Sequence, residues 1–163
     1  MDVSFARKLD YYLGNIICSF LNCFFVHFLK RPNKNIEKLL FLELSERGSA
    51  ILAYSAIKKA KEIYPNAKLY FWIFRENVES VEILREIENK RIILMRSNNL
   101  WVIFIDTIKN LVKIRREKID VVIDMELFSR FTSILTFFSG AHTRVGFHRF
   151  AMEGIKRAES YTH

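Results

Sequence analysis

The chain has 163 residues, of which half are hydrophobic and 27% are charged, and its formal net charge is +8. This composition suits one globular domain with a sizeable core and excludes a disordered chain, and the low glycine and proline content excludes collagen-like and low-complexity chains. The two cysteines cannot form a disulfide framework, so a reducing compartment is the default. A two-domain enzyme does not fit in this length, so we expect any family built from two such domains to be half represented here.

The first 34 residues contain a long segment without charge. Between Tyr11 and Leu29 there is no Asp, Glu, Lys or Arg, and the polar side chains recur near one helical face while the remaining face is apolar. This pattern predicts an amphipathic helix and linker over 1–34, with the helix in the plane of a membrane interface and the basic residues of 7–31 on anionic headgroups. Two alternatives stay open: residues 11–29 approach the roughly 20 that span a bilayer, and the helix could instead pack on the domain itself.

Cys23 and His27 lie one helical turn apart in this segment, a spacing that suits two metal ligands. A closed zinc site needs four ligands, and no second pair lies nearby in the sequence. We therefore expect no metal site, and we interpret the cysteine as a small apolar residue and the histidine as an interfacial one.

After a linker at 31–35, short apolar runs alternate with helical patterns. The apolar runs predict buried strands at 38–43, 68–74, 91–95, 120–124 and 143–147. Spacings of three and four residues predict helices at 50–64, 78–88, 100–116 and 128–139, with Gly140 just past the end of the last one. On composition alone, the start of the helix at 100–116 (LWVIFI) could instead be a strand. This alternation predicts an α/β fold over 35–163, with a doubly wound, Rossmann-like parallel sheet.

The same spacing selects the helix sides expected to face the core. In the helix at 50–64 these are Ile51, Leu52, Ile57, Ala60 and Ile63; in the helix at 100–116 they are Leu100, Phe104, Ile108, Leu111 and Ile114. Both tryptophans, Trp72 and Trp101, are expected in the core as well. The basic residues at 109–118 are typical of a solvated helix end.

Polar residues follow the predicted strands. In a doubly wound sheet the ligand crevice lies beyond the carboxyl ends of the strands, so these residues are expected along one edge. They are the loop at 45–49, Arg75, Glu76, Arg96, Ser97, Asp124, Glu126, Arg130, His148 and Arg149.

The motifs of several enzyme and binding classes are absent from this edge. There is no three-glycine dinucleotide fingerprint, no phosphate-binding loop with Gly-Lys-Ser/Thr, and no GxSxG nucleophile elbow. Nucleic acid is not expected as a partner either, because neither a zinc-finger spacing nor an aromatic RNA-binding box is present. What remains is a helix start at Gly48 and Ser49, where glycine permits close approach and serine either caps the helix or helps to hold a hydroxyl or phosphate oxygen.

Two charged residues further along this edge, Asp124 and Arg130, can each have more than one role. Asp124 can serve as a base, as a ligand anchor or as the cap of the next helix. Arg130 can pair with Asp124 or Glu126, or it can bind an anionic ligand.

Two stretches resemble glycosyltransferase family 9, the heptosyltransferase-like enzymes of bacterial cell-surface polysaccharide assembly, and the tail at 152–163 (MEGIKRAESYTH) resembles a following loop of the family less closely. Residues 39–65 (LLFLELSERGSAILAYSAIKKAKEIYP) are similar to the first strand, glycine loop and helix of the family. Residues 119–149 (IDVVIDMELFSRFTSILTFFSGAHTRVGFHR) are similar to a block with D-hydrophobic-V-I-D, S-R, S-G-A and R-x-G-F, which is the more specific match. The segment at 7–29 also resembles the membrane-proximal helix of some members.

The resemblance implies the N-terminal, acceptor-side half of a GT-B fold, in which two Rossmann-like domains enclose the active site. It implies inverting transfer of a sugar to a glycan or glycolipid acceptor, with the nucleotide-sugar donor on a second domain and no cofactor bound by this one. It further implies peripheral attachment to the cytoplasmic face of the bacterial inner membrane. An isolated acceptor half is expected to be inactive.

The site residues that the resemblance implies include one departure from the family pattern. Many members carry Asp directly after the loop glycine as the proposed base, and here that position is Ser49. Asp124 and Glu46 are therefore the candidate catalytic residues, and the candidate acceptor-binding residues are Gly48, Ser49, Glu126, Arg130, His148 and Arg149. The serine favours an alternative, a non-enzymatic, membrane-anchored Rossmann-like binding or interaction module.

Overall fold

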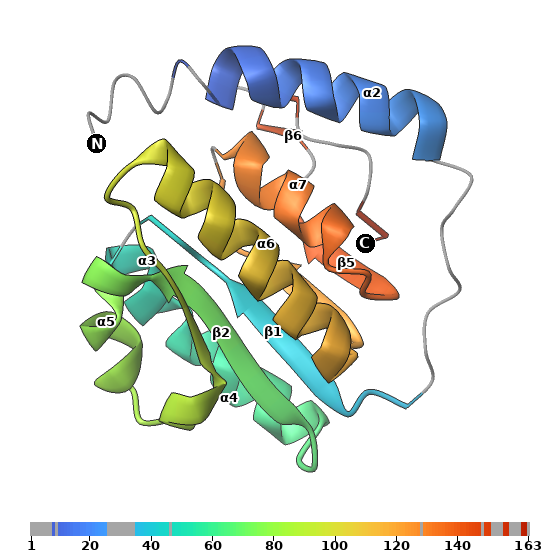
Figure 1. The fold of residues 1–163 in the computed structure, drawn as a ribbon. Helices are drawn as coiled ribbons and strands as arrows, with labels where there is room; N and C mark the ends of the chain where they lie inside the picture. The colour runs from blue at the N-terminus through green and yellow to red at the C-terminus, as the bar shows by residue number, and fades with distance from the viewer. Residues whose placement is uncertain are drawn as a thin grey trace.

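A parallel sheet forms the centre of the molecule (Figure 1). The computed structural model describes residues 8, 10–25, 35–45, 47–127, 129–147, 149–150, 155–156 and 161–162, with only the backbone path for 21–25, 47, 149–150 and 155–156. The five strands are β1 (Lys38–Leu42), β2 (Lys68–Phe74), β3 (Ile92–Met95), β4 (Val121–Asp124) and β5 (Thr143–Gly146). They pair in parallel in the order β3-β2-β1-β4-β5, which confirms the predicted Rossmann-like α/β arrangement.

Helices cover both faces of the sheet (Figure 1). One face packs against α3 (Arg47–Leu52), α4 (Tyr54–Ile63) and α5 (Glu79–Glu82). The other face packs against α6 (Leu100–Glu117) and α7 (Arg130–Phe138). Side chains alternate between the two faces along each strand, and both faces are buried, which explains why the strands read as continuous apolar runs.

The predicted helix at 50–64 is divided into α3 and α4 at Ala53, and its core-facing side agrees with the expected one only at Ile57 and Ala60. Small residues, Ala50, Ala53 and Ala60, line the buried side together with Ile57. The expected Ile51, Leu52 and Ile63 are exposed instead, Leu52 to 79%. The apolar spacing alone was ambiguous, because small side chains can face the sheet as well as large ones.

The predicted helix at 78–88 is mostly irregular. Only α5 is α-helical there, flanked by the 3₁₀ turns η3 (Arg75–Asn77) and η4 (Asn89–Arg91). Arg85 has a positive φ of 53°, which a continuous right-handed helix does not allow. The expectation of a long helix over these residues was wrong.

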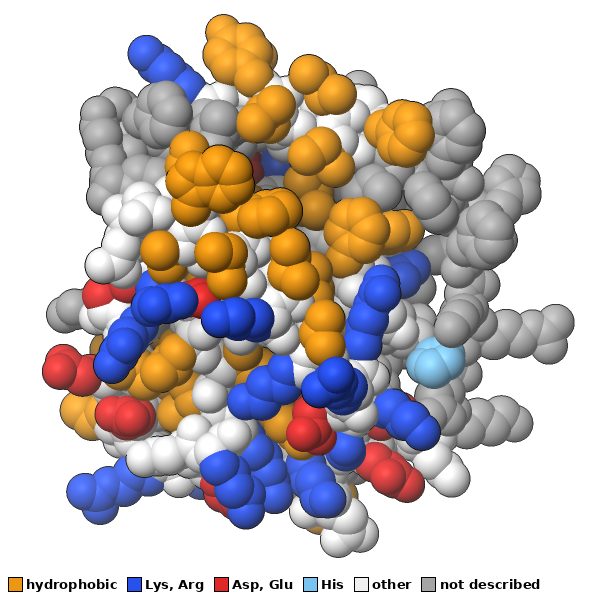
Figure 2. Space-filling view, in the orientation of Figure 1, with side chains coloured by type: hydrophobic (Ala, Val, Ile, Leu, Met, Phe, Trp, Pro, Cys, Tyr) orange, Lys and Arg blue, Asp and Glu red, His pale blue; other side chains and the backbone are white. Residues whose placement is uncertain are grey.

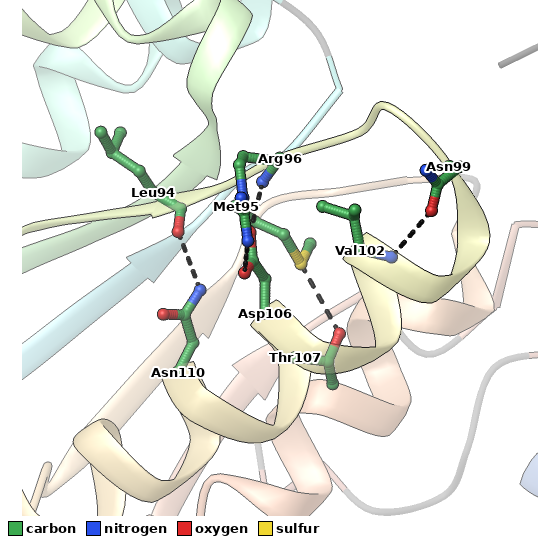
Figure 3. Close-up of polar contacts among 8 residues, drawn as sticks. All are labelled: Leu94, Met95, Arg96, Asn99, Val102, Asp106, Thr107 and Asn110. Carbon is green, nitrogen blue, oxygen red and sulfur yellow. Dashed lines mark hydrogen bonds and ion pairs between the residues drawn. The ribbon is translucent and has the colours of Figure 1, made fainter.

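The helix α6 has the predicted length, and Leu111 and Ile114 face the core as expected, but the other expected core residues do not. Leu100, Phe104 and Ile108 were expected to face the core and are exposed. Trp72 is fully buried as expected, whereas Trp101 is 77% exposed. The residues of α6 that face the sheet include polar ones that bind the end of β3, and these contacts fix the rotation of the helix (Figure 3).

The helix α7 ends as predicted. The hydroxyl of Ser129 accepts a hydrogen bond from the Thr132 amide at its start, at 3.3 Å. Gly140 follows the C-cap with a φ of 79°, in the left-handed region that favours glycine. This confirms the terminating role expected for Gly140.

The N-terminal segment forms η1 (Asp10–Gly14), a π-helical stretch, and α2 (Asn15–Phe25), which lie against α7 (Figure 1). The carboxylate of Asp10 accepts hydrogen bonds from the amides of Arg130 and Phe131, at 3.1 and 2.7 Å. Gly14 is buried, and a Cβ at this position would lie 2.8 Å from the Cβ of Arg130. The described part of this segment is therefore packed on the domain, one of the alternatives left open by the sequence.

Within the described residues, no helix has both the length and the apolarity to cross a bilayer. Residues 26–34, which complete the predicted segment and linker, lie outside the described residues. A short antiparallel ribbon, β6 (Arg149–Phe150) with β7 (Ile155–Lys156), follows the sheet.

Candidate functional site

The strand order places a crevice position between β1 and β4, where the direction of winding reverses. Leu42 at the end of β1 is in register with Asp124 at the end of β4, which in turn is in register with Gly146 of β5. The loops that leave β1 and β4 therefore start side by side at the carboxyl edge. This is where doubly wound sheets bind their ligands.

Glu126 holds the two loops together. Its Oε1 accepts hydrogen bonds from the amides of Leu44 and Ser45, at 3.0 and 2.8 Å, and from the Ser45 hydroxyl at 2.7 Å. From the other side, the Asn77 side chain donates to the carbonyls of Leu44 and Ser45, at 3.1 and 3.0 Å. Glu126 thus fixes the backbone of the β1 loop. Asn77 was not among the predicted site residues, because no motif marks it in the sequence.

Asp124 is the most enclosed of the predicted site residues that the structure describes, with an exposed fraction of 1%. Its Oδ1 accepts a hydrogen bond from the Glu126 amide at 3.1 Å. Its Oδ2 accepts one from the Tyr161 hydroxyl at 2.6 Å and a longer one from the Thr136 hydroxyl at 3.5 Å. The carboxylate therefore has a dense set of donors from its own chain.

Tyr161 reaches Asp124 because the chain near its end runs beside β5. The amide of Thr162 donates to the Arg144 carbonyl at 2.8 Å, and the Arg144 amide donates to the Thr162 hydroxyl at 2.9 Å. The Tyr161 ring occupies the space beside Gly146, where an added Cβ would clash with a ring carbon. Sequence reasoning missed Tyr161, since nothing local marks a residue that closes over a strand end.

Gly48 and Ser49 lie in the first turn of α3, directly after the β1 loop. The helix begins at Arg47, so Ser49 lies inside it and is not its N-cap, contrary to one of the two expected roles. A Cβ added to Gly48 would meet no atom within 4 Å, so packing does not require glycine there. Glu46, a candidate catalytic residue, lies outside the described residues.

Arg130 is buried and turned toward the N-terminal segment. Its Nη1 lies 3.8 Å from the Asp10 carboxylate, and its guanidinium lies 5.3 Å from the centre of the Tyr11 ring. Neither partner was among the expected ones, Asp124 and Glu126, because the docking of η1 on α7 could not be foreseen. His148 lies outside the described residues, and Arg149 is described by its backbone alone, in β6.

The opposite, amino edge of the sheet has a depression of about 300 Å³ near the start of β2. Its lining includes Lys61, Arg85, Glu86 and Arg91. Lys61 and Lys58 both bind the Glu86 carboxylate, at 2.6 and 3.0 Å, and these hydrogen bonds lower the pKa of Glu86 below its ordinary value. Basic and acidic side chains around this depression bind one another, which leaves less charge to attract a ligand. The carboxyl edge therefore remains the stronger candidate site.

Among the described residues, no group of three or more His, Cys, Asp or Glu side chains is arranged to hold a metal ion. The chemistry that the carboxyl edge offers is that of buried carboxylates, Asp124 and Glu126, next to backbone amides and hydroxyls. Such groups can orient a hydroxylated ligand or accept a proton from one.

A scan of the sequence against protein-family models finds no match. A search of curated proteins finds no significant relative either.

Proposed function

We propose that residues 35–163 form the acceptor-side domain of an inverting glycosyltransferase of GT-B type. The observation that carries the proposal is the position of the two stretches that resemble glycosyltransferase family 9. One of them contains β1, its loop, α3 and α4, and the other contains β4, α7 and β5, so both flank the crevice position at the carboxyl edge. Both parts of the resemblance therefore lie around the same position in the fold, which supports the proposal.

In the proposed reaction an acceptor hydroxyl attacks the anomeric carbon of the donor sugar. The bond to the nucleotide diphosphate breaks, the configuration inverts, and a base takes the proton of the attacking hydroxyl. On this proposal the donor is held by a second domain, and this domain binds no cofactor. The acceptor is a glycan or glycolipid of the bacterial cell surface, met at the cytoplasmic face of the inner membrane.

Two carboxylates, Asp124 and Glu46, are the candidate bases. Asp124 is covered by Tyr161, so it can accept a proton from an acceptor only after the tyrosine hydroxyl leaves it. Glu46 is the other candidate. Gly48, Ser49, Glu126, Arg130, His148 and Arg149 are proposed to contribute to the acceptor site, with Glu126 acting through the β1 loop that it holds.

A second candidate function is a non-enzymatic binding or interaction module attached to a membrane. It is favoured by the hydrogen bonds that Asp124 receives from its own chain and by the serine at position 49, where many family members carry the proposed base. In such a module the buried carboxylates would stabilise the crevice and would take no part in proton transfer.

The test is to incubate the chain with lipopolysaccharide core oligosaccharides and with nucleotide sugars, separately and together. Glycosyl transfer and nucleotide release are followed by mass spectrometry, and binding by calorimetry. The enzyme-domain proposal predicts binding of an oligosaccharide without turnover, because the donor site is placed on another domain. Turnover by this chain, or tight binding of the nucleotide sugar alone, would contradict it.

A further inference from the structure

The helix α6 faces the sheet with polar as well as apolar side chains, because Asp106 is buried on the same side as Ile114. Asp106 is buried and accepts hydrogen bonds from the amide, Nε and Nη2 of Arg96, at 2.8 to 3.0 Å (Figure 3). One turn further along, the Asn110 side chain donates to the Leu94 carbonyl at 2.9 Å, and the Thr107 hydroxyl contacts the Met95 sulfur. These polar contacts with the end of β3 hold the helix in a fixed rotation.

The outward side of α6 carries large apolar side chains from Trp101 to Val112. Five large side chains there are 43 to 77% exposed: Trp101, Phe104, Ile105, Ile108 and Val112. An isolated exposed hydrophobic residue needs no explanation, but a continuous helical face does. Exposed Lys109 lies beside Ile108, and exposed Lys113 and Arg116 follow in the last turns, so basic side chains border the apolar ones and predominate toward the end of the helix.

The η1–α2 segment extends this apolar surface. Tyr11, Tyr12, Leu13, Ile16, Ile17 and Phe20 are 40 to 67% exposed. The helix α7 lies between the two elements and contacts both. Figure 2 shows hydrophobic side chains gathered over α2 and α6 on one face of the molecule, with Lys and Arg side chains gathered beside them. The α6 face and the exposed residues of η1–α2 together are called the docking face below.

The side chains of the docking face favour one kind of binding partner over another. Aromatic residues with a polar group, such as Tyr and Trp, favour the boundary between headgroups and acyl chains, and basic residues favour anionic headgroups. A second copy of the chain would bring another net charge of +8 with its own basic residues against the first, and these like charges would repel. An anionic bilayer complements both parts of the face at once.

We propose that the docking face binds an anionic lipid bilayer, with Trp101 and Phe104 at the acyl boundary and Lys109, Lys113 and Arg116 at the phosphates. The sequence suggested membrane contact only for the segment at 7–31, and the proposal adds α6. The apolar residues of α6 were expected in the core and its basic residues at a solvated helix end. The proposal does not rest on glycosyl transfer, and it applies equally to a non-enzymatic module.

The two tryptophans provide a direct probe in the wild-type chain, since Trp72 is fully buried and Trp101 is exposed. The full chain is mixed with vesicles of phosphatidylcholine and phosphatidylglycerol. Tryptophan emission is expected to shift to shorter wavelength and to be quenched by lipids brominated near the headgroup end of the acyl chain. Vesicles of phosphatidylcholine alone are expected to bind more weakly, and salt should weaken binding to the anionic ones.

Variants separate α6 from the N-terminal segment. Phe104→Glu combined with Ile108→Glu is expected to lower partition into anionic vesicles by roughly tenfold or more, because two apolar anchors become charged. Ile83→Glu, at an exposed residue next to α5 on the opposite side of the sheet, is the matched control and should bind like the wild type. Far-UV circular dichroism checks that all variants are folded.

Three results would overturn the proposal. The first is an emission spectrum that does not change with anionic vesicles. The second is wild-type binding by the α6 variant, which would leave membrane contact to other residues. The third is a blue shift that grows with protein concentration in lipid-free buffer together with a doubled mass, which would assign the face to a second copy of the chain.

Discussion

At the scale of single residues, the carboxyl edge depends on a few buried polar side chains whose partners are far away in sequence. Asp124 meets Tyr161, and Glu126 meets the loop at 44–45 more than 80 residues earlier. The sequence marks the acidic residues by their position after an apolar run, but it does not mark the donors. Prediction therefore found the carboxylates and missed Asn77 and Tyr161.

The hydrogen bond from Tyr161 to Asp124 should contribute measurably to stability. Tyr161→Phe removes the only hydroxyl of that side chain and leaves a buried carboxylate oxygen with one donor fewer, so we expect a loss of about 1–3 kcal/mol in the free energy of unfolding. Urea denaturation measures it. Tyr12→Phe, at an exposed tyrosine, is the control and should change little. Equal stability of the two variants would show that the contact is dispensable.

The pairing of Asp106 with Arg96 makes the free energy of unfolding depend on pH in the acid range. Hydrogen bonds from Arg96 lower the pKa of Asp106 from its ordinary 3.8 to about 2, against the opposing effect of burial. Because the pKa is lower in the folded state, this stabilisation is present above pH 3.8 and is lost as the pH falls toward about 2. Asp106→Asn should flatten the pH dependence of unfolding in that window.

Thermal unfolding followed between pH 2 and 5 tests this prediction. The wild type should lose more stability than Asp106→Asn as the pH falls. The variant should also be less stable near neutral pH, since the charged acceptor of three hydrogen bonds is removed. Parallel pH profiles for the two proteins would rule out a folded-state pairing at this position.

At the scale of elements, the strands were predictable and the rotation of the helices was not. All five strands lie within one or two residues of their predicted bounds, because strands buried on both faces consist of uninterrupted apolar residues. Helix rotation depends on which side meets the sheet. Along α3 and α4 the buried side consists mainly of alanines, and in α6 polar side chains that bond to the end of β3 share the inner side with apolar ones. Apolar spacing correctly placed Ile57, Ala60 and Ile114 in the core, but it also placed exposed residues there, such as Leu52 and Phe104.

At the same scale, a single substitution can test the contact between η1–α2 and α7. Gly14→Ala places a Cβ 2.8 Å from the Cβ of Arg130, so the two elements must move apart. We expect faster amide hydrogen exchange in α2 and a loss of about 1–3 kcal/mol in stability. Gly48→Ala is the matched control, because a Cβ there meets no atom within 4 Å and φ is not positive.

Unchanged exchange in α2 of the Gly14→Ala variant would mean that this segment does not depend on α7 for its structure. Residues 10–25 would then be held by something other than the contact with Arg130. The outcome also bears on the membrane alternatives, because a segment that releases easily from α7 can rearrange on a lipid surface.

At the scale of the whole molecule, the carboxyl edge and the docking face carry different kinds of side chain. The carboxyl edge collects the residues proposed to meet a glycan acceptor, and the docking face collects apolar and basic residues proposed to meet lipid. A glycolipid acceptor would bring both together, since its sugar and its acyl chains lie on either side of the headgroup boundary. The overall α/β order and the N-terminal part of the docking face follow from the sequence pattern, whereas the α6 part became visible only with the rotation of that helix.

The central claim is that an acceptor glycan binds at the carboxyl edge between β1 and β4. Backbone amide chemical shifts, measured while lipopolysaccharide core oligosaccharides are added to the ¹⁵N-labelled chain, test it most directly. The account predicts that the largest changes fall in the loops after β1 and β4, at 44–49 and 125–127. Changes confined to the depression at the amino edge, around Lys61, Arg85 and Arg91, or no changes with any oligosaccharide, would contradict it.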